Sequence, residues 1–134
     1  MKTFSVGDSY SSAKTIQAED IELFAQVSGD DNPVHLDESF AAGTRFKRRI
    51  AHGMLSASLI SAILGTKFPG PGTIYLGQSL KFLAPVYIGD TVHTTVVVES
   101  FDPVKGKMVL KTICANQDGV EVISGQAEVL YRPF

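Results

Sequence analysis

The chain has 134 residues, a formal net charge of −2, 44% hydrophobic residues and 19% charged residues. This length and composition predict a single globular domain over residues 1–134 and argue against intrinsic disorder. No basic excess favours nucleic-acid binding, and no apolar stretch is long enough to cross a bilayer.

The single cysteine, Cys114, excludes an internal disulfide and lies in an apolar run. We therefore expect a buried thiol in a reducing compartment. The first ten residues hold no apolar segment typical of a signal peptide. Together these features predict a cytoplasmic protein without a membrane or nucleic-acid partner.

The first half of the chain predicts one strand and two helices. YSSAKTI, residues 10–16, is typical of a strand, and QAEDIELFAQVSG, residues 17–29, has helical apolar spacing and a C-terminal glycine. The polar stretch SGDDNPVHLD follows as a loop, then DESFAAGT as one more helical turn and TRFKRR as an exposed basic connector. HGMLSASLISAILG, residues 52–65, is apolar on nearly every side, which predicts a buried central helix.

The second half predicts four long strands, because segments 73–86, 90–101, 106–117 and 120–132 are rich in β-branched residues. The short connections YIGD, DPVKG and NQDG indicate antiparallel neighbours. An α+β domain follows, with about five strands curled around the central helix. Its open sheet edges favour pairing, so we expect a homodimer joined edge to edge.

The polar stretch has the residues for acid–base chemistry. Pro33 fixes its own φ and pushes Asn32 toward extended backbone, which predicts a non-helical turn carrying Asp30 and His35. A carboxylate and an imidazole that converge can hold one water, take its proton and return one, as hydration of a double bond requires. The alternative is an Asx-turn with a helix cap.

A second candidate lies in IAHGML, at the start of the central helix. The N–H of Gly53 could bind a carbonyl oxygen that becomes an enolate, because helix N-termini present unpaired N–H groups. The alternative is that Gly53 only permits tight packing. We expect His52 to be a cap-like surface residue. The three histidines lack metal-ligand spacing, so no metal site is expected.

The stretch SGDDNPVHLD resembles the motif of the MaoC-like, (R)-specific enoyl-CoA hydratases, Gly-Asp-x-Asn-Pro-hydrophobic-His, at residues 29–35. IAHGMLSASLISAILG and the strands after it resemble that family in order and spacing. The resemblance implies a hot-dog fold, a dimer whose two sheets join, and syn hydration of trans-2-enoyl-CoA to (R)-3-hydroxyacyl-CoA. It implies an acyl-CoA substrate and no separate cofactor.

By the same resemblance, Asp30 and His35 are the catalytic pair and the Gly53 N–H binds the thioester oxygen. Asn32 organises the turn, and Ser61 orients the aspartate or bonds only its own helix.

The basic connector is the point where the sequence departs from the family pattern. Family members often have proline before I-[AV]-H-G-M, and this chain has Arg49. Phosphates of coenzyme A are candidate ligands for the connector, which is otherwise an ordinary solvated loop. Its basic residues are Arg45, Lys47, Arg48 and Arg49.

Three other functions stay open from the residues. These are an acyl-CoA thioesterase, a 3-hydroxyacyl carrier protein dehydratase and a non-catalytic acyl-CoA binding subunit. The sequence does not decide whether the product feeds polyhydroxyalkanoate synthesis, fatty-acid breakdown or another acyl-CoA route.

Overall fold

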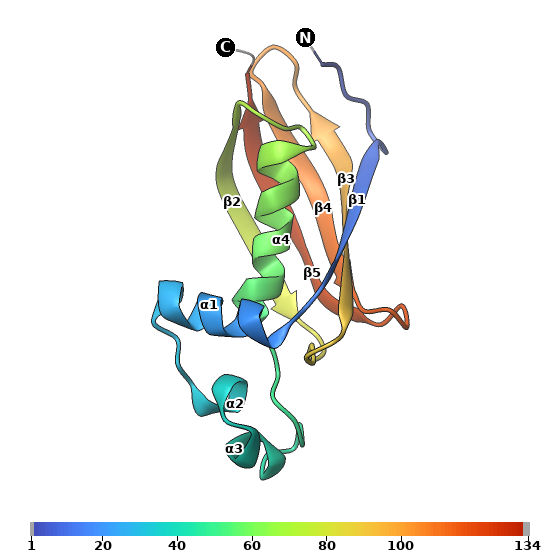
Figure 1. The fold of residues 1–134 in the computed structure, drawn as a ribbon. Helices are drawn as coiled ribbons and strands as arrows, with labels where there is room; N and C mark the ends of the chain where they lie inside the picture. The colour runs from blue at the N-terminus through green and yellow to red at the C-terminus, as the bar shows by residue number, and fades with distance from the viewer. Residues whose placement is uncertain (1, 133–134) are drawn as a thin grey trace.

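A five-stranded antiparallel sheet curls around one helix, α4, in the computed structural model, which describes residues 2–132 (Figure 1). The strands are β1 (Ser9–Thr15), β2 (Thr73–Phe82), β3 (Thr91–Phe101), β4 (Lys107–Ala115) and β5 (Glu121–Tyr131). The helices are α1 (Ala18–Ser28), α2 (Pro33–Leu36), α3 (Glu38–Ala42) and α4 (Gly53–Thr66). The predicted α+β architecture is confirmed.

The strand order is β1-β3-β4-β5-β2, and every neighbouring pair is antiparallel. The prediction that short connections join neighbours is correct for β3-β4 and β4-β5. It is wrong for YIGD, because β2 pairs with β5 and β3 pairs with β1. The predicted strand also ends early, at Phe82 rather than residue 86. Residues 83–90 instead run across the end of the sheet to reach β3.

Helix α4 packs one face into the concave sheet. Its buried residues are Leu55, Ser56, Ala57, Ile60, Ile63 and Leu64. Alternate residues of β3 and β4 meet them, and among these Cys114 is fully buried, as predicted. Burial raises the pKa of the Cys114 thiol. The opposite face of α4 is exposed in the single chain, at Met54 and Ser61 among others.

The N-terminal helices lie at one end of the sheet, where α4 begins (Figure 1). Asp20 accepts a hydrogen bond from the Gln17 N–H at 2.8 Å, which secures the start of α1. Gly29 ends α1 in the left-handed conformation, with φ 79°, as its position predicted. No helix within residues 2–132 is long and apolar enough to cross a membrane.

The segment Pro33–Leu36 was predicted to be non-helical, and that prediction is wrong. It forms the single turn α2, with Pro33 in its first turn. The missing N–H of a proline costs nothing there, because first-turn N–H groups have no partner within the helix, and its fixed φ suits a helix start. Only Asn32, before the proline, stays outside the helix, as expected.

The register of β2 against β5 can be tested at Gly125. A Cβ at this position would lie 1.9 Å from the Ser79 carbonyl oxygen of β2. Gly125→Ala should therefore lower the free energy of unfolding by about 1–3 kcal/mol, measured by urea unfolding.

Gly65→Ala is the matched control, because a Cβ at this exposed α4 position meets nothing within 4 Å. It should leave stability unchanged or raise it by up to about 1 kcal/mol. Wild-type stability of Gly125→Ala would contradict this register.

Candidate active site

The polar stretch between α1 and α3 builds its own shape from local hydrogen bonds. The Asp30 carboxylate accepts the Asn32 N–H at 3.3 Å, and the Asn32 side-chain oxygen accepts the Val34 N–H at 3.2 Å. Asn32 thereby caps α2. Asp37 caps α3 through the Phe40 N–H, as expected of a capping residue. The Asx-turn and a catalytic role for Asp30 therefore do not exclude each other.

His35 is held in one orientation by the backbone of a distant segment. Its Nδ1 lies 2.8 Å from the Ile50 carbonyl oxygen. A carbonyl only accepts, so Nδ1 carries the proton and the neutral ring keeps an unprotonated Nε2. The side chain is 9% exposed, and this burial is the main cause that lowers the pKa of His35 below its ordinary value. The ring is therefore suited to act as a base.

His52 was expected on the surface, and that prediction is wrong. It is only 2% exposed and stacks on His35, with ring centroids 3.9 Å apart and planes inclined by 27°. Its Nε2–H donates to the Asp30 backbone oxygen at 2.9 Å. The residue does precede α4, but its side chain makes no cap hydrogen bond and turns toward α1, where it contacts Phe24.

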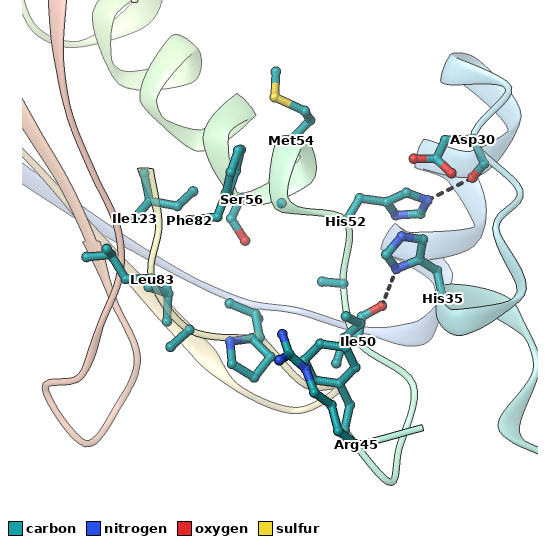
Figure 2. Close-up of a pocket in the computed structure, with 17 residues that line it drawn as sticks. Asp30, His35, Arg45, Ile50, His52, Met54, Ser56, Phe82, Leu83 and Ile123 are labelled. Carbon is teal, nitrogen blue, oxygen red and sulfur yellow. Dashed lines mark hydrogen bonds between the residues drawn. The ribbon is translucent and has the colours of Figure 1, made fainter. Parts of the chain in front are cut away.

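A cavity of about 420 Å³ opens beside these residues, within the usual size range of small-molecule sites. Figure 2 shows the Asp30 carboxylate and both imidazoles on one side of the cavity and apolar side chains on the other. The apolar lining includes Phe82, Leu83, Val86, Val122 and Ile123. The cavity thus combines an acid–base end with a wall suited to hydrocarbon.

Gly53, the first residue of α4, also lines the cavity. No acceptor among residues 2–132 pairs with its N–H, and the helix dipole adds positive potential there. A Cβ at this position would lie 2.6 Å from the Phe82 ring. The absence of a side chain therefore lets the ring lie close to the helix start.

Two serines of α4, Ser61 and Ser56, have different surroundings. Ser61 is exposed and does not line the cavity, so its expected role is without structural support in the single chain. Ser56 does line it, is 2% exposed, and its hydroxyl has no partner among residues 2–132. Its oxygen points into the cavity (Figure 2). The sequence could have indicated that Ser56 lies at the cavity, because it follows Gly53 by three residues and so lies on the same face of the helix.

The basic connector divides into separate environments. Arg45 lines the cavity, and its guanidinium lies 4.9 Å from the Phe46 ring centroid. Arg48 lies over Tyr87 at 4.1 Å, and Lys47 is exposed. Arg49 instead turns inward, and its Nε–H donates to the His35 backbone oxygen at 2.7 Å. The four residues therefore do not form one patch.

The fold brings together three groups that can ligate metals, although their spacing in the sequence suggested none. One donor atom from each of Asp30, His35 and His52 lies within 4.8 Å of the others. The arrangement suits a metal poorly, because stacked imidazoles carry their lone pairs in nearly parallel planes and cannot aim them at one ion. The expectation that the site works without a metal stays a prediction.

Comparison with known proteins gives concordant results. The family model "MaoC like domain" matches residues 4–118. An (R)-specific enoyl-CoA hydratase of Rhodospirillum rubrum is 56% identical over 124 residues, covering 92% of this chain and 85% of the relative. A mitochondrial 3-hydroxyacyl-[acyl-carrier-protein] dehydratase of Arabidopsis thaliana is 38% identical, covering 93% of this chain and 76% of the relative.

Among solved structures, the (R)-hydratase from Aeromonas caviae involved in PHA biosynthesis superposes with a TM-score of 0.94 at 42% identity. The match covers 98% of this chain and all of that one. The curled sheet around one helix is therefore the same fold in both.

The ionisation of His35 can be measured directly. Burial lowers its pKa below the ordinary 6.5, so its imidazole resonances should titrate with a midpoint below that value in an NMR pH series. His35→Gln assigns the resonance by its loss. A midpoint above 6.5 would contradict the geometry.

The same shift has a consequence for stability. Below about pH 6.5 the unfolded chain binds a proton at His35 more readily than the folded chain. The free energy of unfolding therefore decreases as the pH is lowered below about 6.5, and His35 causes no such change at higher pH. His35→Gln should weaken this fall, measured by urea unfolding at about pH 7.5 and 5.5.

Proposed function

The chain belongs to the MaoC-like domain family, and we propose that it catalyses the reversible syn hydration of trans-2-enoyl-CoA to (R)-3-hydroxyacyl-CoA. The carrying observation is the convergence of Asp30 and His35 at the polar end of a cavity whose other wall is apolar. Relatives named as (R)-specific enoyl-CoA hydratases support the same reaction.

The proposed mechanism uses one water held between the two side chains. Both the Asp30 carboxylate and the unprotonated Nε2 of His35 accept hydrogen bonds, so they bind the two hydrogens of one water and raise its nucleophilicity. As the water oxygen bonds to the β-carbon, one of the two acceptors, Asp30 or His35, takes a proton from the water. The proton then goes to the α-carbon on the same face. The addition is syn because one water supplies both groups.

The negative charge formed during addition resides on the thioester oxygen. The Gly53 N–H, free at the start of α4, is the proposed donor to this oxygen. Asn32 acts indirectly, because its cap on α2 fixes the backbone that carries His35. Ser61 keeps its proposed supporting role toward Asp30, which the single chain does not explain.

Coenzyme A is proposed to lie with its phosphates near the exposed cations Arg45, Lys47 and Arg48. Arg45 supports this best, since it lines the cavity itself. We propose no cofactor beyond the substrate and no membrane or nucleic-acid partner. The cytoplasmic location stays a prediction from composition.

A homodimer is proposed through the edge strand β2. This strand has one free edge and exposes Ile74 and Leu76 to 48% and 53%. The exposed face of α4 lies on the same concave side of the sheet, beside β2 (Figure 1). An apolar edge of this kind is stabilised by pairing with another strand.

A carrier-protein substrate is the second candidate, favoured by the relative named as a 3-hydroxyacyl-[acyl-carrier-protein] dehydratase. The thioester chemistry would be identical, and only the recognition of the carrier would differ. Comparing kcat/KM for crotonyl-CoA and for the crotonyl carrier protein distinguishes the two.

The proposed reaction is tested by following the absorbance of crotonyl-CoA with purified protein and analysing the product on a chiral phase. Loss of the conjugated absorbance with an (R)-3-hydroxy product supports the proposal. Release of free thiol instead would show a thioesterase, and tight binding without turnover would show a binding subunit.

The acid–base pair is tested by Asp30→Asn and His35→Ala. Each should lower kcat by about 100-fold or more with folding retained, the range for a lost acid–base group. Asp30→Asn keeps the oxygen that accepts the Asn32 N–H, so it removes the charge and not the turn. Asp31→Asn, at the exposed neighbour, is the matched control and should stay near wild type. Near-normal turnover of either test variant would contradict the mechanism.

The oxyanion position is tested by Gly53→Ala. The new Cβ would displace the Phe82 ring, which lies 2.6 Å from it. We expect kcat/KM to fall by about tenfold or more, because small displacements of a bound substrate are costly. The double variant Gly53→Ala, Phe82→Ala removes the clash. Its kcat/KM should therefore lie close to that of Phe82→Ala alone. No loss in the single variant would count against a close fit at this position.

A further inference from the structure

Arg49 is the one residue of the basic connector that contacts the backbone of a proposed catalytic residue. Its Nε–H donates to the His35 carbonyl oxygen at 2.7 Å, and its Nη2 is buried without a partner among residues 2–132. Arg49 is half-buried, and its Nε and Nη2 atoms are turned inward, away from a phosphate at the surface. This position therefore does not fit the coenzyme A contact expected from the sequence.

The contact compensates for the shortness of α2. A helix of four residues has no stability of its own. Its Pro33 carbonyl accepts the Asp37 N–H at 2.9 Å, and the carbonyls after it lack partners within the helix. Two of these carbonyls are bound by consecutive residues, Arg49 at the end of the basic connector and Ile50 directly after it. The Val34 oxygen accepts the Ile50 N–H at 3.3 Å, and the His35 oxygen accepts the Arg49 side chain.

Ile50 also orients the His35 ring, because its carbonyl oxygen accepts the Nδ1–H at 2.8 Å. The backbone and the imidazole of His35 are thus held from one short segment. Of these three bonds, the one from Arg49 is charge-assisted, which makes it the strongest type.

This contact is specific to the present sequence within the pattern described above. A proline at position 49, frequent in the family motif, has no side-chain donor, so the bond could not form. The bond to the His35 carbonyl therefore depends on the arginine side chain of this sequence.

We propose that Arg49 is a positioning residue: its guanidinium holds α2 so that the His35 Nε2 faces the reacting water. The inference rests on the proposed function only in assigning His35 to catalysis. The hydrogen-bonding of the His35 ring is measurable without any turnover.

The test compares Arg49→Met and Arg49→Lys with Arg45→Met, on crotonyl-CoA and on crotonyl-pantetheine, which lacks the nucleotide phosphates. Arg49→Met should lower kcat about tenfold on both substrates with KM unchanged, since it misplaces His35. Arg49→Lys should recover part of kcat. Arg45→Met should raise KM on crotonyl-CoA alone.

Arg132→Met is the matched control. The Nε–H of Arg132, directly after β5, also donates to a backbone oxygen, that of Lys105, at 3.1 Å. The C-terminal end of β5 lies at the end of the sheet away from α1 and α2 (Figure 1). It should leave kcat and KM unchanged on both substrates.

The spectroscopic arm is independent of activity. In the wild type, long-range ¹H–¹⁵N spectra should show His35 as the single Nδ1–H tautomer, and Arg49→Met should show a mixture. If Arg49→Met does not fold, Arg49→Lys carries the same comparison. An Arg49→Met variant that raises KM only on crotonyl-CoA, or that keeps both kcat and a single His35 tautomer, would overturn the inference. Absence of hydratase activity in the wild type would refute the proposed function and leave the tautomer test standing.

Discussion

The hydrogen bond from His35 to the Ile50 carbonyl is the contact on which the site depends. It joins the turn after α1 to the segment that leads into α4, and α4 is itself fixed by burial in the curled sheet. His52 makes the reciprocal bond, from the segment beside α4 to the Asp30 backbone. These two bonds cross between the same two segments, so the acid–base residues are located relative to the rigid core and not to a loose loop. The first bond also selects the tautomer that leaves His35 Nε2 free.

The two halves of the proposed chemistry come from different physical sources. Asp30 is exposed and His35 is buried, so the carboxylate remains solvated while the imidazole is kept neutral by desolvation. In the proposed reaction, the positive end of α4 supplies the donor for the thioester oxygen from the backbone alone. The partial positive charge at the start of α4 thus lies where negative charge forms on the thioester oxygen in the proposed reaction. The apolar wall of the cavity suits an acyl chain, which has no polar groups to pair.

Local chemistry predicted a large part of this arrangement. Gly29 ended a helix, Pro33 kept Asn32 out of a helix, and the spacing of Asp30 and His35 placed them together, because each depends on a few adjacent residues. Contacts across the fold were not predictable in this way. The burial of His52, the crossing from β2 to β3, the inward turn of Arg49 and the position of Ser56 at the cavity all depend on packing between distant segments.

The central claim is that one water, held by Asp30 and His35, supplies both groups added to the double bond. It is tested most directly by hydrating crotonyl-CoA in D₂O and determining the configuration at both C2 and C3 of the product by NMR. The account predicts one diastereomer, with (R) configuration at C3 and deuterium at C2 on the face that received the oxygen. A mixture at C2, or deuterium on the opposite face, would show that proton and hydroxyl come from separate sources and would contradict the account.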